Sequence, residues 1–382
     1  MGIFQNMECS TRLLVETWWI AAVAPLICIQ LTRLLISQAQ RVGLVDHPGG
    51  RKRHRAPTPL VGGLAIFLTI MVSALFLGRM PGASWSLFMA LLVTLVIGLA
   101  DDVHEVGHQA KFLAQIVAAL IIVFGTSVQV TSLGDLLGYG PIILGKWSAL
   151  VTVIAIVGLM NAVNMIDGLD GLAGTLVLLP LLLLSGIAFG SEHTLQTLEM
   201  LVIAGAIAGF LSFNLRTPWQ SRAVIFMGDT GGMLLGLLLA WNSIQLAGYA
   251  DAPIKPITVV WIIAMPLLDM GCVMMLRIWQ GKSPFHADRQ HLHHILQRGG
   301  YTCGQVVFIM SGLSLIGAIG ALEAQRIGTP EYVMFYGFLL VLAIYLAALA
   351  KPKQTLQLIS LWLPPKVVAP PRYGFQISAE NE

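Results

Sequence analysis

Charged residues are scarce in this sequence. They make up 11% of its 382 residues, against about 25% in a typical soluble domain, and so few charges cannot cover the surface of a soluble protein of this size. A formal net charge of +3 forms no stripe that would neutralise a nucleic-acid backbone, so we expect no nucleic-acid partner. The hydrophobic residues, 56% of the chain, exclude a disordered protein. What remains is a polytopic membrane protein.

Cysteine is also rare, and its spacing matches no disulfide framework or metal motif. The four cysteines are Cys9, Cys28, Cys272 and Cys303. Before the first apolar run the chain carries Glu8 and Glu16 with Arg12 as the single basic residue, and no small-residue cleavage site follows. We therefore predict a retained span there rather than a secretory signal peptide.

Long continuous apolar runs dominate the rest of the chain. They lack the alternating hydrophobicity of a membrane β-barrel, and a helical crossing of the lipid bilayer needs about 17–25 such residues. We predict eleven transmembrane helices, at residues 18–38, 60–78, 84–100, 110–130, 147–163, 172–190, 197–215, 228–248, 254–277, 303–322 and 332–350. The predicted fold is all-α, with a single integral-membrane domain over residues 1–350 and an irregular cytoplasmic tail of unassigned role over 351–382.

The distribution of positive charge predicts the orientation. Sixteen lysines and arginines fall in one set of connections and five in the other. The five are Arg12, Arg79, Lys146, Lys255 and Arg326. By the positive-inside rule the richer set is cytoplasmic, so the N-terminus is predicted to be periplasmic and the C-terminus cytoplasmic.

The histidines follow the same asymmetry. Eight of the nine, all but His193, fall in the inside connections together with the clustered carboxylates. An active site that faces the cytoplasm accounts for this distribution. The alternative is that the inside connections are simply longer and more polar.

The first inside connection is strongly basic. Residues 41–55 contain five lysines and arginines, including Arg51 and Lys52, and His54 lies among them. Such a cluster beside a membrane attracts anionic lipid or phosphate. We assign Arg51, Lys52 and His54 to the lipid phosphate or to the shape of this loop, with a plain positive-inside anchor as the alternative.

Two adjacent carboxylates, Asp101 and Asp102, end another apolar run, and Lys111 follows ten residues later. Adjacent carboxylates repel each other unless a cation or a proton lies nearby, so such a pair suits divalent-metal chemistry or proton abstraction. A solvated helix end is the alternative interpretation.

A polar stripe lies at the inner end of the span at 147–163 and just beyond it. Asn161, Asn164, Asp167 and Asp170 recur every three residues, so neighbours share a helix face, and glycines follow at 168, 171 and 174. Amides and carboxylates at the edge of a membrane are costly without partners, which favours a functional interpretation.

Asp229 begins a further span and has glycines on both sides, in the segment Phe226–Gly232. The N-terminus of a helix leaves N–H groups free and carries a positive dipole end. Asp229 can therefore hold a metal while the backbone binds phosphate oxygens. An aspartate that only caps the helix is the alternative.

The last motif holds four imidazoles and an arginine between His286 and His294. The residues concerned are His286, Arg289, His291, His293 and His294. Such a set can clamp a diphosphate; a zinc site is the alternative, but no H-E-x-x-H pattern is present. We predict that Asp269 and Arg277 in the preceding span form a structural pair, since they lie eight residues apart.

These motifs together resemble the polyprenyl-phosphate N-acetylhexosamine-1-phosphate transferases, a family of bacterial membrane enzymes. The matching segments are Gly98–Asp102, Asn161–Gly171, Phe226–Gly231 and His286–His294, with the first basic loop in addition. The last motif is similar to the branch that uses UDP-N-acetylglucosamine and undecaprenyl phosphate. The likeness covers about residues 41–300.

The resemblance implies the transfer of N-acetylglucosamine-1-phosphate, or a related N-acetylhexosamine-1-phosphate, from a UDP-sugar to undecaprenyl phosphate with release of UMP. Such a reaction would begin a lipid-linked glycan such as O-antigen or another cell-envelope polysaccharide at the bacterial inner membrane. The resemblance also implies Mg²⁺, with Mn²⁺ as a substitute. Family members often pair up, but the sequence does not decide whether this chain forms a homodimer.

Residue roles are likewise carried over by motif position. Asp229 and Asn164 resemble metal ligands, and Asp101 and Asp102 resemble the pair that orients or deprotonates the lipid phosphate. Lys111 resembles a phosphate-binding lysine. The remaining matches surround the UDP-sugar: Asn161, Asp167, Asp170, His286, Arg289, His291, His293 and His294. From a different class, an ion-coupled transporter stays as the alternative, although it would place its polar sites near the bilayer midplane.

Overall fold

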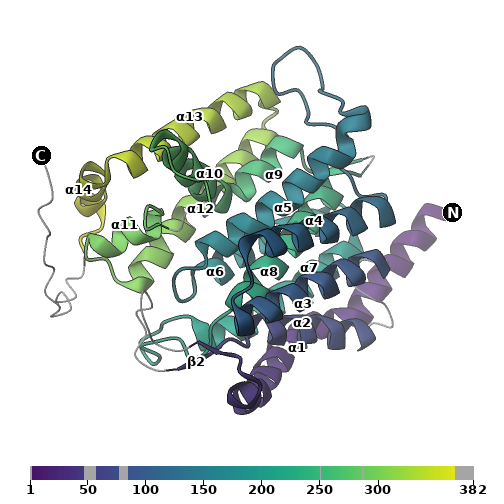
Figure 1. Ribbon diagram of the computed structural model, residues 1–382. Helices are drawn as coiled ribbons and strands as arrows, with labels where there is room; N and C mark the ends of the chain where they lie inside the picture. The colour runs from purple at the N-terminus through teal and green to yellow at the C-terminus, as the bar shows by residue number, and fades with distance from the viewer. Residues whose placement is uncertain (1, 47–56, 77–84, 250, 286–287, 366–382) are drawn as a thin grey trace, which may run out of the picture.

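A computed structural model describes residues 2–46, 57–76, 85–249, 251–285 and 288–365, with side chains from Trp18 onward. Its helices lie side by side as a bundle (Figure 1). They are α1 (Gly2–Val42), α2 (Gly62–Phe76), α3 (Trp85–His104), α4 (His108–Gly125), α5 (Ser148–Ile166), α6 (Leu172–Gly190), α7 (Thr194–Asn214), α8 (Gly228–Ala247), α9 (Pro256–Ile262), α10 (Ala264–Trp279), α11 (Leu292–Arg298), α12 (Cys303–Arg326), α13 (Glu331–Ala350) and α14 (Pro352–Trp362).

Nine of the described helices are long and apolar enough to cross a membrane. The predicted span at 60–78 is the 15-residue helix α2, which at about 1.5 Å per residue is short for a bilayer crossing. The predicted span at 254–277 is broken into α9 and α10, bent by 80°. The chain is therefore a multi-pass, all-α membrane protein; eleven complete spans and the orientation of the termini stay predictions.

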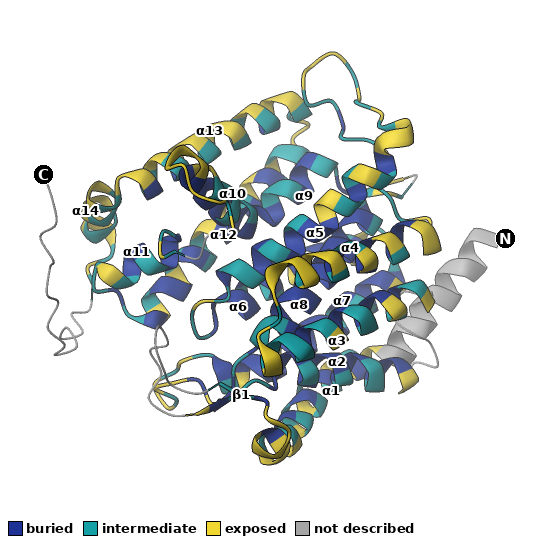
Figure 2. Cartoon of the chain, viewed as in Figure 1, coloured by how far each residue is buried: buried dark blue, intermediate teal, exposed yellow. Residues whose placement is uncertain are grey.

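The helix α8 lies at the centre of the bundle. Of the 18-residue apolar stretch in each helix, 83% of the residues are buried in α8 but only 11% in α13. Figure 2 shows the same contrast, with α8 dark and much of α13 exposed. Helices α2, α3, α5 and α6 all pack on α8, so its N-terminus is fixed by several neighbours.

A short antiparallel pair joins the first inside connection to this end of α8. The strands β1 (Val45–Asp46) and β2 (Thr58–Pro59) pair, and the Phe226 N–H donates to the Pro59 carbonyl at 2.8 Å. In return, the Gly62 and Gly63 N–H groups donate to the Phe226 and Met227 carbonyls. The segment before α8 is therefore held in place by β2 and the start of α2.

The tail differs from the prediction. Residues 352–362 form the helix α14 rather than an irregular segment, because Leu356 and Ile359, three residues apart, pack one side of it against the core. Its Leu356 lies against Gly299, and the Tyr301 hydroxyl donates to the Leu363 carbonyl at 2.9 Å.

Candidate active site

Asp102 fixes the N-terminus of α8. Its carboxylate, on α3, accepts hydrogen bonds from the Asp229 N–H at 2.8 Å and from the Thr230 N–H and hydroxyl at 3.3 and 2.6 Å. Gly228 makes the sharp turn before the helix at a φ of +71°, a conformation that favours glycine. Asp102 therefore caps α8 from a neighbouring helix and sets the position of Asp229.

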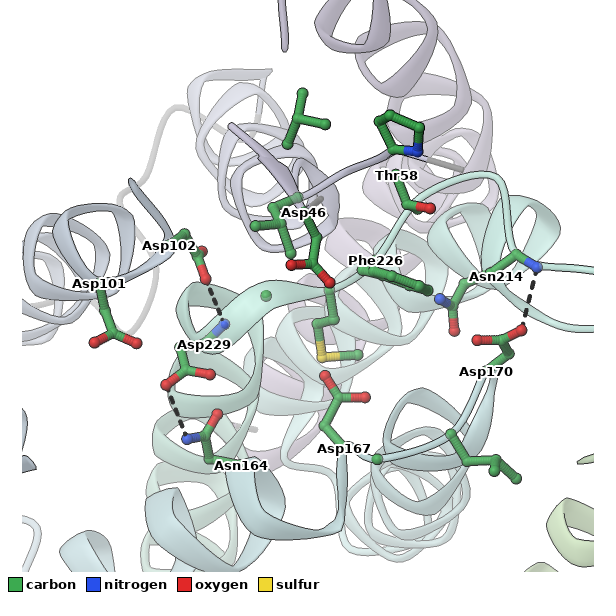
Figure 3. Close-up of a pocket in the computed structure, with 18 of the residues that line it drawn as sticks. Asp46, Thr58, Asp101, Asp102, Asn164, Asp167, Asp170, Asn214, Phe226 and Asp229 are labelled. Atoms are coloured by element: carbon green, nitrogen blue, oxygen red, sulfur yellow. Dashed lines mark hydrogen bonds between the residues drawn. The ribbon is translucent and has the colours of Figure 1, made fainter. Parts of the chain in front are cut away.

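The helices α3, α4, α5 and α8 bring their polar side chains together at this point, and Figure 3 shows those of α3, α5 and α8. The Lys111 ammonium of α4 bonds Asp229 at 2.6 Å and Asp101 at 3.0 Å. From α5, the Asn164 amide donates to the same Asp229 oxygen at 3.4 Å. The sequence predictions for Asp101, Asp102, Lys111, Asn164 and Asp229 thus converge on one cluster, which we call the carboxylate cluster.

Glycines make this convergence of helices possible. A Cβ at Gly98 of α3 would overlap Thr230, and one at Gly63 of α2 would overlap Gly231. A Cβ at Gly232 would overlap Asn164. Because all three positions lack a side chain, the neighbouring backbones approach α8 closely enough for short side chains to meet.

Asp167 follows the end of α5 and points into the space between Asp229 and Asp170 (Figure 3). Burial and, to a smaller extent, the neighbouring carboxylates Asp229, Asp102 and Asp170 together raise the pKa of this carboxyl to about 7. A cation or a hydrogen-bond donor from a bound molecule would be stabilised at this position.

Two other residues of the polar stripe are engaged by the protein itself. Asp170 accepts from Arg216 at 2.6 Å and from the Ala223 N–H at 3.2 Å. Asn161 donates to Gln115 at 2.6 Å and to the Val157 carbonyl. Asp170 still lines the cleft described below, whereas Asn161 does not.

The structure divides the histidines of the last motif into different environments. His291 is buried and its Nδ1 lies 2.7 Å from Asp269. His293 is 1% exposed against Gly168; burial and the neighbouring His294 lower its pKa to about 3, so this imidazole is neutral. His294 and Arg289 line the cleft.

Asp269 and Arg277 do not pair with each other as predicted from their spacing. The Arg277 guanidinium instead bonds Asp288 through two nitrogens, at 2.8 and 3.0 Å. Burial raises the pKa of the Asp288 carboxyl, but the hydrogen bonds from Arg277 and the Gln290 N–H outweigh it, so the net pKa is lowered. Asp269 and Arg277 therefore both contact the segment 288–292, but through different residues.

A cleft of ≈ 1520 Å³ is lined by most of the predicted polar residues: Asp101, Asp102, Asn164, Asp167, Asp170, Asp229, Arg289 and His294. Sequence reasoning missed several other lining residues, among them Asp46, Arg216, Arg222 and Phe226. The two arginines could have been found from the sequence, since they flank a short connection on the face predicted to be cytoplasmic. The cleft gathers carboxylates on the side of α8 and cations on the side of Arg216, Arg222 and Arg289.

A metal would find oxygen ligands here but no complete cage. Among the described residues, no group of three or more histidine, cysteine, aspartate or glutamate side chains is arranged to hold a metal. Asp229 and Asn164 supply oxygens on facing helices, and Mg²⁺ commonly uses one or two protein ligands with waters and substrate phosphates. This donor set fits such an ion. Four predicted residues lie outside the described part of the chain: Arg51, Lys52, His54 and His286.

Comparisons with known proteins identify the family of this chain. Residues 84–247 match the model of Glycosyl transferase family 4. The chain is 34% identical over 310 residues to the undecaprenyl-phosphate alpha-N-acetylglucosaminyl 1-phosphate transferase of Escherichia coli strain K12, covering 80% of this chain and 84% of that protein. The protein of the same name from Pasteurella multocida is 35% identical over 315 residues, with 80% and 86% covered.

The enzyme of this name from Salmonella typhi is 33% identical over 333 residues, which cover 85% of this chain and 90% of that protein. The region that matches the family model includes the whole carboxylate cluster, since α3, α4, α5 and α8 all fall within residues 84–247. With such identity over four fifths of its length, the chain belongs to the polyprenyl-phosphate N-acetylhexosamine-1-phosphate transferases.

Proposed function

We propose that this enzyme transfers N-acetylglucosamine-1-phosphate from UDP-N-acetylglucosamine to undecaprenyl phosphate and releases UMP. The reaction would take place at the cytoplasmic face of a bacterial inner membrane and begin a lipid-linked glycan such as O-antigen. The observation that carries the proposal is the carboxylate cluster: Lys111, Asp229 and Asn164 meet at a fixed helix N-terminus, at one end of the bundle beside a cleft that also holds arginines.

The chemistry needs little covalent help from the protein. An oxygen of the lipid phosphate attacks the β-phosphorus of the UDP-sugar, and the bond from that phosphorus to the bridging oxygen breaks, so that UMP leaves with the electron pair. Catalysis of phosphoryl transfer rests mainly on alignment and charge neutralisation. A phosphate monoester is largely ionised at pH 7, so no strong general base is required of Asp101.

The residues in and beside the cleft have different roles in this reaction. Lys111 lies between Asp101 and Asp229, which line the cleft, and its ammonium can bind an acceptor phosphate oxygen there. Arg216, Arg222 and Arg289 provide charge for the donor diphosphate. Phe226 presents a ring to the cleft, against which a base can pack. A Mg²⁺ held by Asp229 and Asn164 would neutralise charge on the diphosphate.

The experiment uses the purified protein in nanodiscs with UDP-N-acetylglucosamine, undecaprenyl phosphate and Mg²⁺, and it measures UMP. We expect UMP release that needs both substrates and stops with EDTA. A panel of other UDP-N-acetylhexosamines identifies the preferred sugar. No UMP from any UDP-sugar would refute the proposal, and a phospho-enzyme trapped with UDP-sugar alone would refute direct displacement.

A further inference from the structure

A buried carboxylate outside the cleft supports the histidine motif. Asp269 lies on α10 and is 1% exposed. One of its oxygens lies 2.7 Å from His291 Nδ1, and the other accepts from the Leu292 N–H at 3.0 Å. Because Leu292 is the first residue of α11, Asp269 caps that helix from a different element.

A tyrosine from α13 completes this arrangement. The Tyr345 hydroxyl donates to the same Asp269 oxygen at 2.8 Å, and the side chain is 9% exposed. Three helices that are separate in sequence, α10, α11 and α13, therefore meet at one carboxylate. A buried carboxylate with three hydrogen bonds has a defined orientation, whereas one that loses a donor is costly to keep buried.

The contact also determines what His291 can do. With Nδ1–H donated to Asp269, the neutral ring leaves Nε2 as an acceptor, and Arg277 lies 3.5 Å from that atom. Both ring nitrogens of His291 are thus turned toward protein groups rather than the cleft. His291 acts as an anchor, and the residues that it carries into the cleft are Arg289 before it and His294 after it.

We propose that Asp269 and Tyr345 are positioning residues for the donor side of the active site. They fix the His291 ring and the start of α11, and thereby hold Arg289 and His294 over the cleft. This inference rests on the proposed transferase function. It predicts that loss of either contact weakens binding of the UDP-sugar more than binding of the lipid phosphate. The lipid phosphate is assigned to the carboxylate cluster, which lies on other helices: α3, α4, α5 and α8.

The test compares Tyr345→Phe with Tyr336→Phe, a variant on the same helix whose ring is 51% exposed. We expect Tyr345→Phe to raise KM for the UDP-sugar ~5-fold with little change in kcat or in KM for the lipid, and Tyr336→Phe to change nothing. Asp269→Asn should raise the donor KM ~30-fold, within the range found when the partner of a site ligand is removed. The combination of Asp269→Asn with His291→Asn should be less damaging than the sum of the two single losses, because both remove the contact between Asp269 and His291.

Hydrogen exchange at residues 288–298 gives a readout that does not depend on activity. Faster exchange in Tyr345→Phe, and not in Tyr336→Phe, supports the inference even when Asp269→Asn does not fold. Unchanged exchange, or equal losses for donor and acceptor, would overturn it. A wild-type protein that releases no UMP would refute the proposed function, while the exchange comparison would still decide whether Tyr345 positions the motif.

A second inference comes from α14, which has two apolar sides. Leu356 and Ile359 pack against the core, whereas Leu358, Leu361 and Trp362 are 64%, 78% and 90% exposed. Only Lys351 separates α14 from the largely lipid-facing span α13. In Figure 1, α14 turns away from α13 beside α11.

We infer that the exposed side of α14 inserts into the surface of the membrane and prefers anionic lipid. The helix is continuous with an embedded span, and Lys351 and Lys353 lie at its start. A short helix with an apolar side and basic residues lies in the plane of the membrane surface, where each lysine near anionic headgroups stabilises binding.

Spin labels test this arrangement in nanodiscs of defined lipid. Leu358→Cys is compared with Gln357→Cys, one residue away and about 100° round the helix, in a Cys9→Ser background, since Cys28, Cys272 and Cys303 are buried. We expect the label at 358 to collide with oxygen more than with a water-soluble nickel complex, the reverse at 357, and a deeper position at 358 when phosphatidylglycerol replaces phosphatidylcholine.

Equal access of nickel to both labels would overturn the inference. So would an immobile label at 358 with dipolar broadening, which identifies a second copy of the chain as the occupant. An identical depth in both lipids would overturn the preference for anionic lipid.

Discussion

The carboxylate cluster and the histidine motif hold their polar groups in different ways. In the cluster, Lys111, Asp229 and Asn164 lie on long helices that glycines bring into contact, and these groups bond one another directly. In the motif, Arg289 and His294 lie on and beside a short helix whose position depends on Asp269 and Arg277 behind it. We infer that close helix packing alone holds the carboxylate cluster in place, whereas the histidine motif depends on Asp269 and Arg277.

The largest effect is expected inside the cluster. Asp229→Asn removes the charge that Lys111 contacts and a predicted metal ligand, so kcat should fall ~10³-fold, as for the loss of a principal electrostatic group. UMP release measures this loss. The melting temperature should change little, because the residue is only partly buried. Asp251→Asn, at an exposed acid beyond the other end of α8, should match wild type, and full activity in Asp229→Asn would contradict the assignment.

The rigid packing around the cluster can be tested without touching a polar residue. In Gly98→Ala the new methyl overlaps Thr230, so we expect a destabilisation of about 1–3 kcal/mol and a ~10²-fold loss of activity. Gly158→Ala is the matched control, since a Cβ there meets nothing within 4 Å. It should be neutral or stabilising by about 0.5–1 kcal/mol. Equal effects in the two variants would show that close packing does not hold the cluster.

The two regions also differ in how far sequence predicts them. The sequence predicted that Asp101, Asn164 and Asp229 belong together, because they lie at ends of predicted spans on one side, and the family resemblance added Lys111. Local patterns are sufficient for that conclusion. They do not reveal that Asp102 caps α8, since the bond joins residues 127 positions apart.

Support of the histidine motif was harder to predict. An eight-residue spacing suggested that Asp269 pairs with Arg277, but long-range contacts decide otherwise: Asp269 bonds His291 and Tyr345, and Arg277 bonds Asp288. Hydropathy likewise counts residues 254–277 as one span, because a bend at Ile263 leaves composition unchanged. Tertiary packing fixes such features, and a single sequence carries no direct signal for them.

A smaller effect is expected at Arg277, which supports the histidine motif from outside the cleft. Arg277→Lys cannot bond both oxygens of Asp288, so kcat/KM for the UDP-sugar should fall ~10-fold. Arg326→Lys, at an exposed arginine, is the control. The Asp288 pKa is lowered in the folded protein, so its contribution to stability is present above the unfolded pKa and is lost as the pH falls. The stability deficit of Arg277→Lys should therefore shrink on acidification; a constant deficit would exclude this pair as its source.

The smallest effect concerns Asp167, which lies between the two regions. Its pKa is raised to about 7 from 3.8, so the folded state binds a proton more tightly than the unfolded state, and stability falls as the pH rises from about 4 to 7. Asp167→Asn removes this loss of stability at high pH. The variant should be more stable than wild type at pH 8, by about 1–2 kcal/mol after allowance for solvent screening, and as stable as wild type at pH 4. Thermal unfolding at the two pH values measures the difference. A gain at pH 8 alone identifies Asp167 as a carboxylate whose position reduces stability, as expected for a side chain that contacts substrate; an equal gain at both pH values would assign the effect to packing.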